Sequence, residues 1–351
     1  MDARQIDAAS VAQRLIQLHL AVKPGEQVLL VADPETELAM AYALAAAVQA
    51  AGAEYTLALM PSRTAQRATE LTPIIERGLE AADVLIGLTR TAGAPTYARK
   101  VTELLAARRL RSLSMVMRSL DNWTKGAATA DYEALERLGW HLAAIWGRGE
   151  RVEITSPSGT HLIAGVGKRP VMGQVVIVEC GLAREPGREA AFSDGEISQR
   201  PATASAHGRL VVDGPIALIG GGDDPVTLEV EAGKVVRVEG GRRARRLQQI
   251  LEEVPGADHI AEIGLGLNPN ALRNDDFEEE KKAAGNVHVA LGSDLFYGGD
   301  HACAVHLDMV IRSATFRVDG EPLCVEGRLQ AGAAGALGGP AGGRGGGGRG
   351  G

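Results

Sequence analysis

The sequence predicts an α/β fold, in which an N-terminal doubly wound α/β domain precedes a C-terminal β-rich α+β domain. Apolar runs alternate with helical stretches up to about residue 150, and short strands separated by turns follow from residue 151. The length of 351 residues also exceeds the roughly 250 at which one core usually stops growing. We therefore expect domains at residues 1–150 and 151–330, with a disordered Gly-rich tail at residues 331–351.

The expected N-terminal strands are apolar along their whole length, as in a parallel sheet that is covered on both faces. EQVLLVAD (26–33) is the first, and an Ala-rich helical stretch follows it at residues 36–51. No GxGxxG follows this strand, so the fingerprint of dinucleotide binding is missing. The later strands and the closing helix are EYTLALM (54–60), ADVLIGLT (82–89), RSLSMVM (111–117) and DYEALERLGWHLAAIW (131–146).

The C-terminal region alternates polar and apolar residues with a period of two, which is typical of antiparallel strands. Ala232-Gly233 interrupts one such pattern and predicts a hairpin turn. RRARRLQQILEEV (242–254) has helical periodicity, and NDDFEEEKK (274–282) is typical of a solvated acidic face. The expected strand regions are RVEITSPSGTHLIAGV (151–166), GRLVVDGPIALIG (208–220) and VTLEVEAGKVVRVEGG (226–241).

Charge and composition exclude several classes of function. A net charge of -7 argues against nucleic-acid binding, because phosphate neutralisation requires clustered Lys and Arg. The three cysteines show no CxxC spacing, which fits a reducing compartment. The N-terminus lacks the apolar core of a signal peptide, and no run reaches the ~20 apolar residues of a membrane span. We expect a cytoplasmic protein without a membrane partner.

Ionisable residues recur opposite aliphatic ones in three expected strands near the C-terminus. His306 and Asp308 alternate with Val305, Leu307 and Met309, and His288 and Glu262 occupy equivalent places in the two preceding strands. Polar residues at alternate positions usually face solvent, and that interpretation remains open. Nearby glycines favour close approach to a bound group instead, such as a cation; they are Gly264, Gly266, Gly292, Gly298 and Gly299.

Longer motifs carry a resemblance to a known family. They are FSDGEISQRP (192–201), AEIGLGLNPNA (261–271), EEEKKAAGNVHVALGSDLFYGG (278–299), HLDMVI (306–311) and FRVDGEPL (316–323). Together they resemble the thermophilic metallo-aminopeptidases (aminopeptidases S and T) and their shorter relatives, which include the dihydroxypyridine dioxygenases. The resemblance spans residues 1–330 loosely and residues 190–326 more specifically.

The resemblance implies a set of metal ligands: Glu196, Glu262, His288, His306 and Asp308. The peptidases use a tyrosine seven residues after the first histidine, where this chain has Leu295, with Tyr297 two residues later. The dioxygenases hold one iron with a histidine where Glu262 stands. They also use a histidine base from the N-terminal domain, and TRTAGAPTYARK (89–100) offers none. Glu280 is a candidate for orienting a histidine ligand.

The leading hypothesis is a metal-dependent hydrolase that resembles the aminopeptidases and cleaves a small peptide or amide. Zn, Mn or Co suits this ligand set, and Glu262 or Glu196 would act as the catalytic base. The alternative is a mononuclear non-haem Fe(II) ring-cleaving dioxygenase that binds a small aromatic substrate through His288, His306 and Asp308. A catalytically silent binding protein is the third hypothesis. We expect a homodimer in each case.

Overall fold

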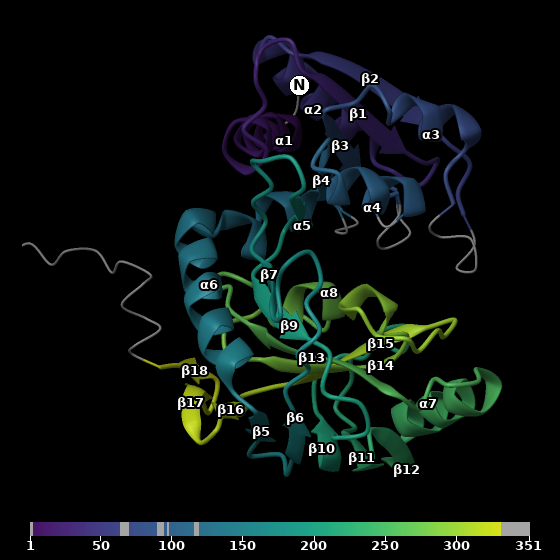
Figure 1. The fold of residues 1–351 in the computed structure, drawn as a ribbon, viewed down its shortest axis with the longest axis vertical. Coiled ribbons are helices and arrows are strands. Elements are labelled where there is room, and N and C mark those ends of the chain that lie inside the picture. The colour runs from purple at the N-terminus through teal and green to yellow at the C-terminus, as the bar shows by residue number, and fades with distance from the viewer. Residues whose placement is uncertain (1–2, 64–69, 90–94, 97, 116–118, 331–351) are drawn as a thin grey trace, which may run out of the picture.

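The computed structural model arranges the chain as two lobes, with the N-terminal lobe above the C-terminal one in Figure 1. The predicted α/β fold class is confirmed by a parallel sheet flanked by helices and by two antiparallel sheets. The predicted tail at residues 331–351 lies outside the described residues, which are 3–63, 70–89, 95–96, 98–115 and 119–330.

A five-stranded sheet of order β2-β1-β3-β4-β8 forms the N-terminal lobe. Apolar side chains fill both of its faces, since Leu30 lies in a core shared with α1 and α2 whereas Leu29 lies in a core shared with α3 and α4. The strands are β1 (Gln27–Ala32), β2 (Glu54–Leu59), β3 (Val84–Gly87), β4 (Arg111–Ser114) and β8 (Glu189–Ala191). The helices are α1 (Ala3–Arg14), η1 (Leu15–His19), α2 (Leu38–Ala50), α3 (Pro73–Gly78), α4 (Arg99–Ala106), α5 (Leu120–Thr124) and η3 (Gly126–Thr129).

Strand β8 links the two halves of the chain. It comes from the β-rich stretch after residue 151, yet it pairs in parallel with β4, with Leu113 opposite Ala190. The first sheet is therefore completed by residues far along the sequence. The division between residues 150 and 151 stays a prediction. Strand β8 crosses it in one direction, and the predicted closing helix of the first domain, α6 (Tyr132–Arg148), crosses it in the other, since it packs against β7 and β9.

Two antiparallel sheets form the C-terminal lobe, in the orders β12-β11-β10-β6-β5-β16-β17-β18 and β15-β14-β13-β9-β7. The hairpin predicted at Ala232-Gly233 is confirmed: both residues have positive φ, and Glu231 pairs with Lys234. The helices are α6 (Tyr132–Arg148), α7 (Arg242–Glu253), α8 (Phe277–Glu280) and η4 (Leu295–Tyr297). The strands are β5 (Arg151–Thr155), β6 (His161–Gly165), β7 (Ile177–Glu179), β9 (Glu196–Gln199), β10 (His207–Val212), β11 (Val226–Glu231), β12 (Lys234–Gly240), β13 (Ile260–Gly266), β14 (Val287–Gly292), β15 (His306–Ile311), β16 (Thr315–Val318), β17 (Glu321–Val325) and β18 (Arg328–Leu329).

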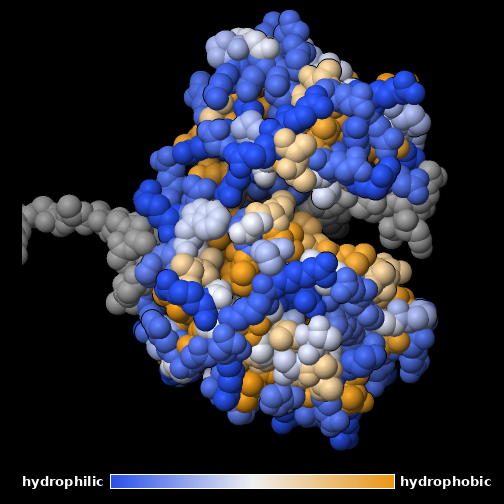
Figure 2. Space-filling model, in the orientation of Figure 1, coloured by the Kyte–Doolittle hydropathy of each residue, from blue (hydrophilic) through white to orange (hydrophobic). Residues whose placement is uncertain are grey.

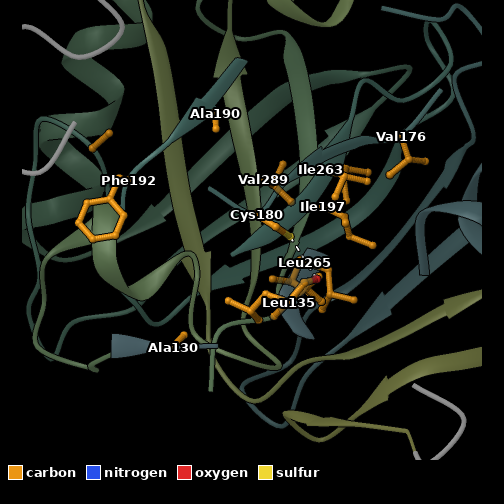
Figure 3. Packing of buried hydrophobic residues seen from close by; sticks show 14 of the residues in the cluster. Ala130, Leu135, Val176, Cys180, Ala190, Phe192, Ile197, Ile263, Leu265 and Val289 are labelled. Carbon is orange, nitrogen blue, oxygen red and sulfur yellow. Dashed lines mark hydrogen bonds between the residues drawn. The ribbon is translucent and has the colours of Figure 1, made fainter. Parts of the chain in front are cut away.

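The five-stranded antiparallel sheet has one apolar face and one polar face. Figure 3 shows Ile197, Ile263, Leu265 and Val289 gathered on the apolar face, near Cys180. Because side chains alternate along a strand, the neighbouring residues point to the opposite face. That polar face is covered as well, since every residue of β13 and β14 is buried. A solvent-facing sheet is therefore the wrong interpretation of the ionisable residues on these two strands.

None of the helices within the described ranges has the length and apolar character needed to cross a bilayer.

Strand β8 gives a prediction about stability and pH. Burial raises the pKa of Glu189 to about 8, and its Oε1 has no hydrogen-bond partner. The folded state then binds a proton that the unfolded chain releases, so Glu189 lowers stability as pH rises from about 4.5 towards 8. We expect Glu189→Gln to match the parent near pH 4.5 and to have a higher Tm at pH 9, measured by thermal denaturation.

The control for this effect is Glu54→Gln, which changes an exposed carboxylate on β2 of the same sheet. It should shift Tm equally at both pH values. An equal shift for Glu189→Gln would contradict the prediction.

Candidate metal centre

Four ionisable side chains from three neighbouring strands meet on the polar face of the sheet. Glu262 of β13 lies between two imidazoles: its Oε1 is 3.0 Å from His288 Nε2 and its Oε2 is 2.8 Å from His306 Nε2. Asp308 Oδ1 is 3.6 Å from His306 Nε2. Ligand atoms of Glu262, His288 and Asp308 all lie within 4.8 Å of one another, which is close enough to share one metal ion.

The strand register produces this grouping. In β14 and β15, Ala290 pairs with Asp308 and Gly292 pairs with His306, while β13 places Glu262 opposite Ala290. Residues opposite one another in a sheet share a face. Small residues on β14 thus leave room for the longer side chains on either side of it.

Gly264 provides the space for the ring of His288. A Cβ atom at this position would lie 2.0 Å from His288 Cε1 and 2.2 Å from its Nε2. Residue 264 pairs directly with residue 288 across the two strands. The ring therefore lies flat over the backbone, and any side chain at 264 would displace it.

Hydrogen bonds orient both imidazoles. His306 Nδ1 is 2.9 Å from the carbonyl oxygen of Ser293. Since a carbonyl only accepts, Nδ1 carries a proton and Nε2 is the atom presented to Glu262 and Asp308. His288 Nδ1 faces Glu196 Oε2 at 3.8 Å, so its Nε2 is likewise the atom on the Glu262 side.

The cluster is charged, and Glu262, His288 and Asp308 are buried whereas the His306 side chain is 33% exposed. Burial alone would raise the pKa of Glu262, but the charges and hydrogen bonds of His288 and His306 hold it well below its usual value. Burial would lower the pKa of His306, and hydrogen bonds to Asp308 and Glu262 raise it well above the usual value instead. Ion pairing therefore outweighs desolvation at these positions.

Lys281 is a member of the site that the sequence did not predict. It follows α8, and its Nζ lies 3.1 Å from Glu196 Oε1 and 3.3 Å from Asp308 Oδ2. Burial would lower the pKa of Lys281, but the negative charges of its neighbours, above all Asp308 and Glu196, raise it well above the usual value. The lysine is thus a fixed positive charge on the polar face.

Two expectations about this segment are wrong. The acidic run was predicted to face solvent, yet Glu279 and Glu280 are buried because each has dedicated donors: Glu279 accepts from backbone NH groups, and Glu280 pairs with Arg312 at 2.8 Å. That pairing also removes Glu280 as an orienter of a histidine ligand. The run of charges at residues 274–282 does not reveal these partners, because Ala127 and Arg312 lie elsewhere in the sequence.

The predicted ligands fall into two groups. Glu262, His288, His306 and Asp308 come together, whereas Glu196 lies beyond the His288 ring and contacts Lys281. Leu295 is 53% exposed. Tyr297 reaches the polar face instead, because its ring stacks on that of His306 with centroids 6.1 Å apart and its OH lies 3.3 Å from Ser198 Oγ. Residues 89–100, where the resemblance implies a histidine base and the sequence has none, lie partly outside the described residues.

The chemistry of the donors fits a divalent metal ion. Among the described residues, His288 Nδ1, Glu196 Oε2 and Asp308 Oδ1 are buried without a hydrogen-bond partner. Buried polar atoms are rarely left unpaired. Asp308 Oδ1 is unpaired on the side of Glu262 and His306, where a cation would pair with it, whereas His288 Nδ1 and Glu196 Oε2 face each other at the other end of the His288 ring. Imidazole and carboxylate ligands are typical of Zn, Mn, Co and Fe(II) centres.

A cavity of about 130 Å³ lies between the two lobes. Ser114 and Glu189 line it from the first sheet, and Glu179 and Phe296 line it from the second lobe. Glu179 pairs with Glu196 across β7 and β9, which brings the cavity next to the polar face. Figure 2 shows hydrophilic residues over most of the visible surface and hydrophobic ones gathered where the lobes meet.

Comparisons with known proteins agree with this picture. The family model of 2,5-dihydroxypyridine 5,6-dioxygenase (NicX) matches residues 11–331. The structure is similar to that of 2,5-dihydroxypyridine dioxygenase from Pseudomonas putida KT2440, with 21% identity, a TM-score of 0.79, and 93% of this chain and 98% of that chain covered. It is also similar to AmpT from Thermus thermophilus, with 17% identity, a TM-score of 0.65, and 93% and 100% covered. No curated protein sequence matches significantly.

Gly264 gives a direct test of the metal centre. We expect Gly264→Ala to displace the His288 ring and to reduce metal affinity by about 10- to 100-fold, as losses of ligand orientation commonly do. Metal affinity would be measured by isothermal titration with Zn(II) or Mn(II). Gly78→Ala is the control, because its nearest neighbour would be 4.0 Å away. Unchanged affinity in Gly264→Ala would place the centre elsewhere.

Proposed function

The chain belongs to the 2,5-dihydroxypyridine 5,6-dioxygenase family, and on that basis we propose that it is a mononuclear Fe(II) dioxygenase that cleaves the ring of a small dihydroxylated aromatic substrate. This reverses the order of the two hypotheses drawn from the sequence. The resemblance to aminopeptidases favoured a hydrolase, whereas the family match favours the oxygenase.

The observation that carries the proposal is that two imidazoles and one carboxylate gather around Glu262. His288 and His306 both present Nε2, and Asp308 presents Oδ1, an oxygen without a hydrogen-bond partner. Two histidines and one carboxylate are the usual ligands of non-haem Fe(II) in oxygenases. When bound, Fe(II) supplies the redox chemistry with dioxygen that no side chain here can supply.

Glu262 has a separate part in the proposal. It contacts both imidazoles, in the place where the resemblance to dioxygenases implies a histidine. Its carboxylate adds a negative charge to the centre and is held ionised by the two rings. A hydroxyl group of the substrate brought against Glu262 would find a proton acceptor there, and we assign it that role.

The cavity supports a small aromatic substrate. Its volume of about 130 Å³ is close to that of an apolar protein cavity of ~150 Å³ known to hold benzene. Phe296 supplies a ring face for stacking, and Glu179 and Ser114 supply hydrogen-bonding groups.

One observation keeps a metal-dependent hydrolase of small peptides as the second candidate. A carboxylate at position 262 that touches both histidines also suits a base for activating water. The two candidates differ in whether dioxygen is consumed.

The first functional prediction concerns oxygen uptake. Protein purified without oxygen and loaded with Fe(II) should consume dioxygen when 2,5-dihydroxypyridine is added. His306→Ala and Asp308→Ala should each lose metal and at least about 99% of this uptake, since each removes one ligand. His161→Ala changes an exposed histidine of β6 and should behave as the parent does. Absence of uptake in the loaded parent would reject the proposal.

The second prediction tests Glu262 as the proton acceptor, and a peptidase assay of the parent separates the two candidates. Glu262→Gln keeps the shape of the side chain but removes its charge and its proton acceptor. If Glu262 accepts the substrate proton, oxygen uptake should fall about 10²–10⁴-fold while Fe(II) is retained, as shown by metal analysis. Release of amino acids from short peptides under Mn, Co or Zn is assayed beside it. Peptide hydrolysis by the parent without oxygen uptake would favour the second candidate.

A further inference from the structure

Lys281 contacts two carboxylates beside the candidate metal centre. Its Nζ is 3.1 Å from Glu196 Oε1 and 3.3 Å from Asp308 Oδ2. Two-metal sites hold their ions about 3.5–4 Å apart and commonly share a carboxylate between them. Asp308 lies between the imidazole pair and the lysine, because its Oδ1 faces His306 and its Oδ2 faces Lys281.

We propose that the Lys281 ammonium takes the place of a second metal ion and restricts the centre to one ion. This inference rests on the proposed mononuclear centre and adds the side chain that keeps it mononuclear. The ammonium pairs with Glu196 Oε1 and with Asp308 Oδ2, the oxygen of Asp308 that faces away from His306. They are then unavailable as ligands for another cation.

Charge balance supports a single ion. Among the buried carboxylates of this region, Glu196, Glu262 and Asp308 contact Lys281 or an imidazole of the centre, whereas Asp194 and Glu278 pair with Lys282. One ammonium and one divalent ion together offset the three negative charges of Glu196, Glu262 and Asp308. A second divalent ion beside Lys281 would leave a net positive charge among buried groups, where such an excess is unfavourable.

Steric constraints lead to the same conclusion. The lysine side chain is 13% exposed, so it has little freedom to swing out into solvent. It follows directly on α8, whose Glu280 is held by Arg312. The next residue, Lys282, points instead to Ser193 O at 3.1 Å and to Asp194 at 3.7 Å. Lys281 is therefore the lysine positioned at the centre, and its neighbour is a matched control.

The test is the number of ions bound per chain. Parent, Lys281→Ala and Lys282→Ala are titrated with Zn(II) and Mn(II) by calorimetry and then assayed by elemental analysis after desalting. We expect one ion in the parent and in Lys282→Ala, and two in Lys281→Ala. The affinity for a second ion should be at least about tenfold higher in Lys281→Ala than in the parent, because the positive charge that repels the ion has been removed.

Loss of Lys281 leaves buried carboxylates unpaired, so the variant is also prepared with millimolar Zn(II) throughout. The added ion should restore folding. We therefore expect the Tm of Lys281→Ala to rise with Zn(II) concentration above that of the parent, and Lys282→Ala to show no such additional rise. Lys281→Gln, which keeps hydrogen-bond donors without the charge, is the second variant and should also take up a second ion.

The outcomes separate the two proposals. Two ions in the parent, or one ion in both Lys281 variants with no rescue by Zn(II), would overturn the role of Lys281 and leave the metal centre in place. No ion in the parent would overturn both. An adventitious surface ion would persist in His306→Ala, whereas ions of this centre would not.

Discussion

The site depends on the burial of opposite charges on one face of a β-sheet. Glu262 and His288 are fully buried, and an isolated charge at such depth would be prohibitively unfavourable. Each charged group on this face therefore needs a partner, and the partners come from separate strands. Glu196, Glu262, His288 and Asp308 therefore depend on their partners, because removal of one partner leaves a buried charge unpaired.

The surrounding structure meets this requirement through register and small residues. The opposite face of the sheet packs Ile263, Leu265 and Val289 into the core, which fixes the pairing of the strands. A slip by one residue would bring the charges into that core and the aliphatic residues to the site. Gly264 and Ala290 then leave the space into which the ionisable side chains fold. Packing on one face therefore specifies chemistry on the other.

Local patterns were sufficient to predict part of this arrangement. Alternation along β13, β14 and β15 identified Glu262, His288, His306 and Asp308, because a strand assigns faces by a local rule. Strand β8 was not predicted, since three residues carry too weak a pattern. Its partner β4 also lies far away in the sequence, as the pairing of Ser112 with Glu189 shows. Lys281 was missed for a similar reason. The segment EEEKK reads as a solvated charge run until the short helix α8 turns it onto the sheet.

The departure at Glu262 and the presence of Lys281 have a common physical explanation. A carboxylate where the resemblance implies a histidine adds one negative charge to the centre, and a buried ammonium nearby restores the balance. The scaffold is similar to solved structures whose names include both a dioxygenase and AmpT, so the fold by itself does not select the reaction. Selection lies in the donor atoms and in the charge around them. Under the proposal for Lys281, one carboxylate on the sheet and one lysine beside it set how many cations the same strands hold.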